Sequence, residues 1–313
     1  MDWNGKPYYS LDFYLKQTFG EKIYRVALDG GMTCPNRDGT IGTGGCIFCS
    51  AGGSGDFAAS RLLSITEQIE QEKVRIQQKR HCSHYIAYFQ AYTNTYAPIS
   101  TLRRLFTEAI SHPDIVVLSI ATRPDCLEEP ILDLLEELNC QKPVWIELGL
   151  QTIHSKTADF IHRGYPLSVY QDAVLRLKKR NITVITHMIL GLPYETQTDM
   201  LESIDYLNQI GCDGIKLQLL HILRGTQLAE LYQKQPFPIL TQEEYLSILI
   251  QCIERLSPQT VIHRVTGDGP KNLLLAPLWS QNKRGILNAL HREMKLRHAY
   301  QGRRFYAGNT HPL

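Results

Sequence analysis

The sequence predicts an α/β fold, a partial (β/α)6 barrel followed by an α-rich basic extension. Three observations predict it: short apolar runs recur along the chain, helical patterns separate them, and polar residues follow most of the runs. Strands repeated every roughly 30 residues, with a helix between them, run parallel through right-handed crossovers. A chain of 313 residues is long enough for one such domain with an appendage.

Seven segments are predicted as strands because they are short, apolar and rich in β-branched residues. They cover residues 23–28, 85–90, 115–122, 144–150, 183–190, 214–220 and, more weakly, 260–265. The barrel is expected to occupy residues 1–240, and the extension residues 241–313.

Helix signals lie between these segments. Ser64 and Glu67 form a capping-box pattern that predicts a helix ending near residue 80. Pro98 is expected to begin a second helix, because apolar residues follow it at helical spacing. Residues 127–138 and 201–210 show the same periodicity.

Three cysteines follow the first predicted strand in the pattern Cys34-x11-Cys46-x2-Cys49. Their count favours an iron–sulfur cluster, because three thiolates leave one iron open to another ligand, whereas a structural zinc ion needs four ligands. The glycine-rich linker between the cysteines could wrap around a bulky group. Zinc stays open as an alternative, with a fourth ligand from residues 81–84, and so does a redox dithiol at Cys46 and Cys49.

Parallel strands bring their C-terminal ends to one edge, and barrels hold their reactive groups there. The candidates at or near these ends are Gln90, Thr122, Glu147, Gln151 and Leu190. Glu147 faces the barrel interior if its strand alternates normally; the alternative is a buried ion pair with a basic neighbour.

The net charge of +2 hides a basic tail. Between residues 281 and 313 the only acidic residue is Glu293, so the tail carries +6 and the rest of the chain −4. Such a segment could bind a phosphate backbone, or it could be a solvated helix face. The basic residues of the tail are Lys283, Arg284, Arg292, Lys295, Arg297, Arg303 and Arg304.

No apolar run has the length of a membrane span, and the first residues are polar where a signal peptide would be basic and then apolar. We therefore expect a cytoplasmic protein with no membrane partner, whose other five cysteines serve as small apolar residues.

The cysteine pattern resembles the cluster loop of radical SAM enzymes, in the long-spaced form of the Elp3-like branch. Residues 147–152 with Arg163, residues 187–196 and residues 122–125 resemble further motifs of that branch. The usual Gly-Gly-Glu after the second strand is replaced by Gln90-Ala91-Tyr92. The whole chain, including its basic tail, resembles the YhcC/YtqA-type subfamily.

The resemblance implies a 4Fe-4S cluster on Cys34, Cys46 and Cys49, with S-adenosylmethionine on the open iron. An electron from the cluster would break the cofactor's C–S bond, and the 5′-deoxyadenosyl radical would take a hydrogen from the substrate. For Arg163 a charge at a helix end beside Gly164 is the alternative. The residues that the resemblance assigns to cofactor binding are Phe48 (beside the adenine), Gln90, Thr122, Glu147, Gln151, Arg163 and Leu190.

The same resemblance implies tRNA as partner and substrate. In the YhcC/YtqA-type (MnmL-like) subfamily, the implied reaction converts a carboxymethylaminomethyl group toward aminomethyl on wobble uridine 34. An electron donor such as flavodoxin or ferredoxin is also implied. Two alternatives remain: a radical SAM enzyme with a small-molecule substrate, and a zinc-dependent RNA-binding module without catalysis.

Overall fold

The computed structural model describes residues 3–53, 55, 58–267 and 269–306. Its main sheet has seven strands in the order β1-β2-β3-β4-β5-β6-β8, and all seven match predicted segments to within one residue at each end. The pairs β1–β2, β2–β3, β3–β4 and β6–β8 are parallel, as predicted. The strands of this sheet are β1 (Tyr24–Leu28), β2 (Tyr85–Phe89), β3 (Ile115–Thr122), β4 (Val144–Gln151), β5 (Thr183–Leu190), β6 (Gly214–Leu219) and β8 (Val261–Arg264).

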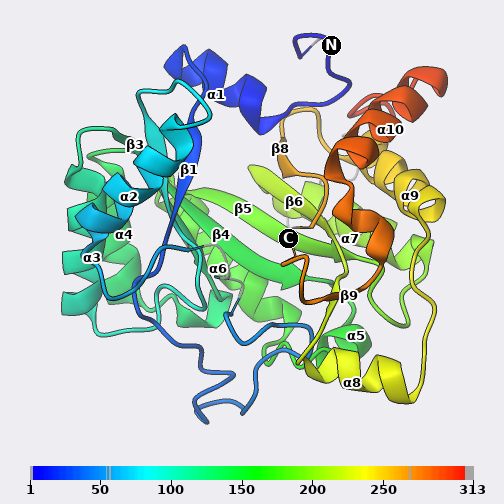
Figure 1. Ribbon diagram of the computed structural model, residues 1–313, viewed down its shortest axis with the longest axis horizontal. Helices are drawn as coiled ribbons and strands as arrows, with labels where there is room; N and C mark the ends of the chain where they lie inside the picture. The colour runs from blue at the N-terminus through cyan, green and yellow to red at the C-terminus, as the bar shows by residue number, and fades with distance from the viewer. Residues whose placement is uncertain (1–2, 54, 56–57, 268, 307–313) are drawn as a thin grey trace. The chain divides into compact units, whose positions relative to one another are not determined.

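Helices alternate with the strands along the chain (Figure 1). The predicted capping box is confirmed at the start of α2, where Ser64 and Glu67 exchange both bonds, and α3 begins directly after Pro98. The helices are α1 (Leu11–Phe19), α2 (Ile65–Gln77), α3 (Ile99–Ser111), α4 (Glu129–Asn139), α5 (Ser155–Phe160), α6 (Leu167–Lys179), α7 (Gln197–Ile210), α8 (Gln227–Lys234), α9 (Gln242–Arg255) and α10 (Lys283–Leu296), with short 3-10 turns η1 (Pro124–Cys126) and η2 (Leu278–Gln281).

The chain divides into two compact units. The first, here called the N-terminal unit, comprises Leu15–Gly149 and Gly164–Ile185. In it α2 packs against β1 and α3 against β3, and α2, α3 and α4 lie side by side (Figure 1). Phe89 of β2 and Phe106 of α3 meet edge to face in its core, with 5.1 Å between ring centroids.

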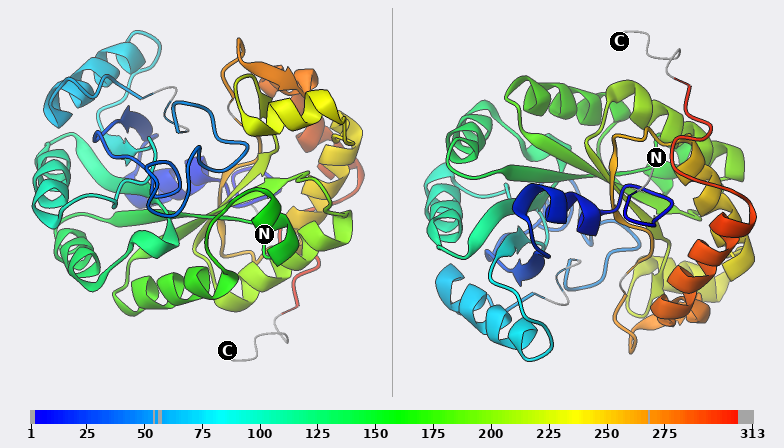
Figure 2. Two further views of the ribbon diagram at one scale, coloured as in Figure 1. Left: turned by 90° about the horizontal axis from the view of Figure 1, so that it is seen from below. Right: turned by 90° about the horizontal axis from the view of Figure 1, so that it is seen from above.

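The second, called the C-terminal unit, comprises Met1–Tyr14, Leu150–Arg163 and Thr186–Leu313. Here α9 packs against both α7 and α10 (Figure 2). The hydroxyl of buried Tyr245 on α9 donates to the carbonyl oxygen of Val265 at 2.6 Å, so it is satisfied inside the core.

The region predicted as an extension is rich in helix, as expected, and it also supplies β8 to the main sheet. Its boundary at residue 240 stays a prediction, and its residues 307–313, like residues 1–2 of the predicted barrel, lie outside the described part of the chain. A small antiparallel pair of β7 (Ile222–Leu223) and β9 (Leu274–Ala276) was not predicted. Among the described helices, none is both long and apolar enough to cross a membrane.

Candidate functional site

Residues 34–49, here called the cysteine loop, follow β1 and fold back on themselves. The amide of Arg37 donates to the carbonyl oxygen of Cys34 at 2.8 Å, and the amide of Cys49 donates to that of Cys46 at 2.9 Å. Gly45 adopts φ +83°, and a Cβ at this position would lie 2.8 Å from Nε of Arg37. The loop therefore closes tightly only with glycine at position 45.

Cys34, Cys46 and Cys49 are half-buried, and none of them forms a disulfide. Burial first, and then the neighbouring thiols of Cys49 and Cys34, raise the pKa of Cys46 to about 12, so the three thiols influence one another electrostatically. Asn36, itself buried, donates from Nδ2 to Sγ of Cys46 at 3.6 Å. Such a trio suits a metal centre, because a coordinated cation removes the thiol protons that burial otherwise retains.

Arg37 clamps the segment that follows the third cysteine. Its Nη2 donates to the carbonyl oxygens of Cys49 at 3.2 Å and Ser50 at 2.6 Å. The guanidinium also lies over the ring of Tyr92, 5.6 Å from the centroid. Arg37 thus fixes the backbone of Cys49 from within the same loop.

Arg123, in the motif at residues 122–125, places a fixed positive charge beside the thiols. It is buried and grips Asp125 with two bonds, Nε to Oδ1 at 2.9 Å and Nη2 to Oδ2 at 2.6 Å. Burial lowers the pKa of Arg123, but the bonds to Asp125 raise it more, so the group stays a cation that acts on Cys34 and Cys46. Arg123, Asn36 and Arg37 were not predicted as site residues, although Arg123 belongs to the motif at residues 122–125.

The N-terminal unit holds four of the predicted cofactor residues: Phe48, Gln90, Thr122 and Glu147. Phe48 lies half-buried in the cysteine loop, and Gln90 directly follows β2. Thr122 is buried at the end of β3, and its hydroxyl shares a hydrogen bond of 2.6 Å with that of Thr95. Their roles toward a cofactor stay predictions.

Glu147 of β4 forms the buried ion pair that the sequence left open as an alternative. Ser119 Oγ donates to its Oε1 at 2.8 Å, and Nη2 of Arg25 lies 3.3 Å from the same oxygen. Arg25 in turn lies 5.1 Å from the ring centroid of Tyr88. This network joins β1, β3 and β4, and cofactor binding by Glu147 stays a prediction.

In the C-terminal unit, Arg163 supports the end of β4. Its side chain is buried, and Nη1 donates to the carbonyl oxygens of Leu150 at 2.9 Å and Thr152 at 2.6 Å. The residue between these carbonyls, Gln151, has a left-handed backbone with φ +62°. Arg163 therefore holds Gln151 in a strained turn, and binding of a cofactor by Gln151, Arg163 or the buried Leu190 stays a prediction.

Five of the seven basic residues of the tail fall into two groups; of the other two, Lys283 is half-buried and Arg297 lies 3.5 Å from the carboxylate of Glu293. Arg303 and Arg304 lie 3.4 and 3.3 Å from the carboxylate of Glu254, whose side chain is buried. By contrast, three basic residues of α10 are exposed on the face opposite its buried Ile286, Leu290 and Met294. We call this the basic face of α10; it consists of Arg284, Arg292 and Lys295.

Residues 81–84 cannot complete a zinc site with the cysteine loop. They precede β2, whereas the loop follows β1, and the two strands are parallel, so about 16 Å of strand lies between them. Cys82 instead donates to the hydroxyl of Tyr85 at 3.2 Å, and His84 pairs with Glu21. That zinc alternative is wrong.

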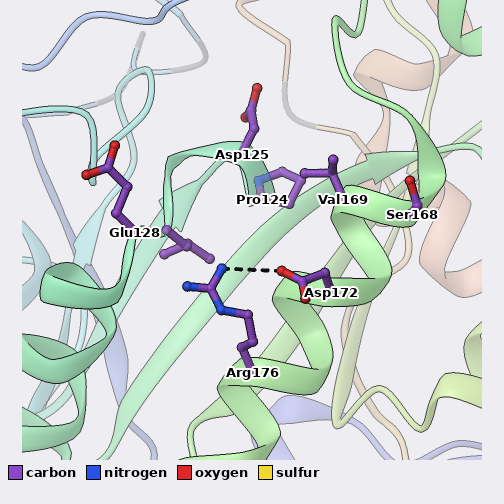
Figure 3. Close-up of a pocket in the computed structure, with 8 residues that line it drawn as sticks. Pro124, Asp125, Glu128, Ser168, Val169, Asp172 and Arg176 are labelled. Atoms are coloured by element: carbon purple, nitrogen blue, oxygen red, sulfur yellow. Dashed lines mark hydrogen bonds and ion pairs between the residues drawn. The ribbon is translucent and has the colours of Figure 1, made fainter.

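Two cavities flank η1 in the N-terminal unit. One, of about 540 Å³, is lined by Pro35 and Ile41 of the cysteine loop together with Tyr96 and Cys126. The other, of about 330 Å³, lies between η1 and α6; Figure 3 shows Arg176 turned toward Asp172 there, and no cysteine lines it. Of these two cavities, the first borders the cysteine loop.

Comparison with known proteins identifies the family. Residues 37–207 match the model of the radical SAM superfamily, and residues 212–296 match that of the Radical_SAM C-terminal domain. The chain is a member of the radical SAM superfamily. It is 44% identical to the uncharacterized protein YtqA of Bacillus subtilis over 96% of this chain and 93% of that protein. It is 38% identical to the protein YhcC of Escherichia coli over 86% of each.

The fold of this radical SAM chain is also that of a solved relative. The archaeal Elp3 of Methanocaldococcus infernus matches with a TM-score of 0.68 at 16% identity, over 89% of this chain and 64% of that one. This chain thus spans less than two thirds of that Elp3. These comparisons confirm three predictions: the partial barrel, the radical SAM superfamily and the similarity to Elp3 proteins.

Radical SAM enzymes use a 4Fe-4S cluster and S-adenosylmethionine, and these are the cofactors of this chain. The donor set fits: the three thiols of the cysteine loop would hold three irons of the cluster and leave the fourth iron for S-adenosylmethionine. A bound 4Fe-4S cluster would supply one electron to S-adenosylmethionine, whose C–S bond would then break to give a carbon radical. The chain's part is to fix the thiols through Arg37, Asn36 and Arg123 and to hold positive charge beside them.

Proposed function

We propose that this radical SAM enzyme modifies tRNA, with Cys34, Cys46 and Cys49 as cluster ligands. The substrate would be wobble uridine 34, whose carboxymethylaminomethyl group is processed toward aminomethyl. The observation that carries the proposal is the cysteine loop, in which Cys34, Cys46 and Cys49 offer three electrostatically coupled thiols, the number that leaves one iron of a cluster open.

An RNA partner is supported from two sides. The resemblance to Elp3-like proteins implies tRNA, and the basic face of α10 offers three exposed cations on one side of a helix. Cations that neutralise phosphates yield an affinity that falls steeply with salt. Because Arg303 and Arg304 are held by Glu254, the basic face of α10 is the better candidate for RNA contact.

The reaction is tested with anaerobically reconstituted protein, reductant, S-adenosylmethionine and tRNA from strains that lack downstream modification. We expect 5′-deoxyadenosine and a changed mass of the wobble nucleoside, both abolished in Cys46→Ala. Cys140→Ala is a matched control, because Cys140 is an exposed thiol at the end of α4, outside the cysteine loop. Formation of 5′-deoxyadenosine with an unchanged nucleoside would refute tRNA as substrate and leave a small-molecule substrate.

The RNA contact is tested by charge reversal. The double variant R284E/K295E is expected to weaken tRNA binding and to flatten its dependence on salt by about two phosphate contacts, with unchanged thermal stability. The double variant K79E/R80E, at two exposed residues that follow α2 in the N-terminal unit, is the control of equal charge change. Equal losses in both variants would contradict a specific contact at α10.

The remaining parts of the proposal concern the cell. The electron would come from a small redox protein such as flavodoxin or ferredoxin, and the location would be cytoplasmic. Replacement of a chemical reductant by either protein in the assay above tests the first of these.

A further inference from the structure

Tyr194 is exposed to an unusual degree for an aromatic residue in a turn at the end of a barrel strand. It lies four residues after the end of β5, and 70% of its surface is accessible. Its backbone is left-handed, with φ +70°. A bulky side chain in this region costs of order 1 kcal/mol or more, and glycine would avoid that cost. Neither burial nor backbone preference therefore explains a tyrosine at this position.

Two side chains of the neighbouring α5 segment surround the ring. Phe160 meets it edge to face, with centroids 5.0 Å apart and planes at 84°. Nζ of Lys156 lies 5.6 Å from the ring centroid. All three residues belong to the C-terminal unit, so their arrangement is internal to one compact body. The group combines a large exposed aromatic surface with a cation.

The turn that carries Tyr194 is held firmly. The amide of Glu195 donates to the carbonyl oxygen of Leu192 at 3.2 Å. Thr196 then caps α7 in a reciprocal box with Asp199, and the ring of His154 contacts the carbonyl oxygen of Asp199 at 2.9 Å. A rigid turn therefore presents the ring, which avoids the entropy cost of ordering a mobile loop on binding.

We propose that Tyr194, Phe160 and Lys156 form a stacking platform for an unpaired base of a single-stranded RNA segment. The base stacks on the exposed ring of Tyr194, Phe160 fixes the ring's orientation, and Lys156 contacts the adjoining phosphate. Stacking of bases on aromatic side chains, with nearby cations for the backbone, is how proteins bind unpaired RNA. This inference rests on the proposed function, because it specifies where the same enzyme holds the loop of its RNA.

The experiment uses Tyr194→Gly, since glycine fits φ +70° and removes the ring without a folding penalty. Loss of one stacked base costs about 1–3 kcal/mol, so we expect single-stranded anticodon-loop RNA to bind about 5- to 150-fold more weakly. Binding of a fully paired duplex should be unchanged, and thermal stability should be equal or higher. Tyr194→Phe, which keeps the ring, should bind as the wild type does.

A second pair of the same geometry gives the control. Tyr232 and Phe237 also meet edge to face at 5.2 Å, so Tyr232→Ala removes a comparable ring from the C-terminal unit and should leave RNA binding unchanged. If wild-type protein binds the loop RNA and Tyr194→Gly binds it equally well, the platform is refuted while the tRNA proposal stands. If wild-type protein binds no RNA, both are refuted.

Discussion

Substitution of Arg37 tests quantitatively how the cysteine loop retains the cluster. The guanidinium of Arg37 donates to the carbonyl oxygens of Cys49 and Ser50, and so ties the segment with the third cysteine to the start of the cysteine loop. Replacing Arg37 with alanine removes two charge-assisted hydrogen bonds from a half-buried site. Each of these bonds contributes about 1–1.5 kcal/mol, so their loss destabilises the closed conformation of the loop by about 2–3 kcal/mol. The equilibrium constant between the closed and the open loop then falls roughly 30- to 150-fold.

The assay compares release of iron to a chelator under anaerobic conditions, followed by the visible absorbance of the cluster. Residues that support metal ligands typically contribute about 10- to 100-fold to metal affinity, in agreement with the estimate above. We therefore expect Arg37→Ala to reconstitute with less iron and to release it at least about tenfold faster than the wild type.

Arg37→Lys is the matched control for charge, because lysine keeps the cation but lacks the planar guanidinium, whose Nη2 donates to both carbonyls and whose carbon lies over the ring of Tyr92. We expect the iron content and the rate of iron release of Arg37→Lys to lie between those of the wild type and Arg37→Ala. Equal iron content and equal release rates in all three proteins would refute the clamp. A loss of helix signal in Arg37→Ala would instead show that the fold, rather than the loop, had failed.

Further predictions concern stability. Burial, Lys283 and Arg264 lower the pKa of His221 from 6.5 to about 4. As the pH falls from 6.5 to about 4, the unfolded chain therefore binds a proton at His221 before the folded chain does, and the free energy of unfolding decreases by up to about 3 kcal/mol. Thermal melts of His221→Gln should lack this decrease. Burial raises the pKa of Glu195 above 4.5, so the folded chain holds this proton more tightly than the unfolded chain, and the stability that this provides is lost as the pH rises. The melting temperature of Glu195→Gln should exceed that of the wild type near pH 7 and equal it near pH 4. Alanine at both Arg303 and Arg304 leaves the buried Glu254 carboxylate unpaired and should cost about 3 kcal/mol in urea unfolding, more than Glu254→Gln; equal costs would contradict this.

The strands were predictable because each is a short run composed mainly of apolar and β-branched residues. β3 and β5 have the bounds that the sequence predicts, Ile115–Thr122 and Thr183–Leu190. The pair β7 and β9 could not be predicted, since strands of two and three residues have no measurable period and join positions about fifty residues apart. Local patterns predict elements, whereas pairing between distant short segments depends on packing.

The same distinction explains what the sequence reveals of the site. The spacing of the three cysteines is local, so it predicts the metal centre directly. The partner of a charged side chain is not local: Arg25 meets Glu147 across more than one hundred residues, and Arg304 meets Glu254 across fifty. Both glutamates sit in the core, where a carboxylate must find a cation or take up a proton. The number of arginines and lysines in a sequence therefore exceeds the number of cations that could contact RNA, because some of these residues neutralise buried carboxylates.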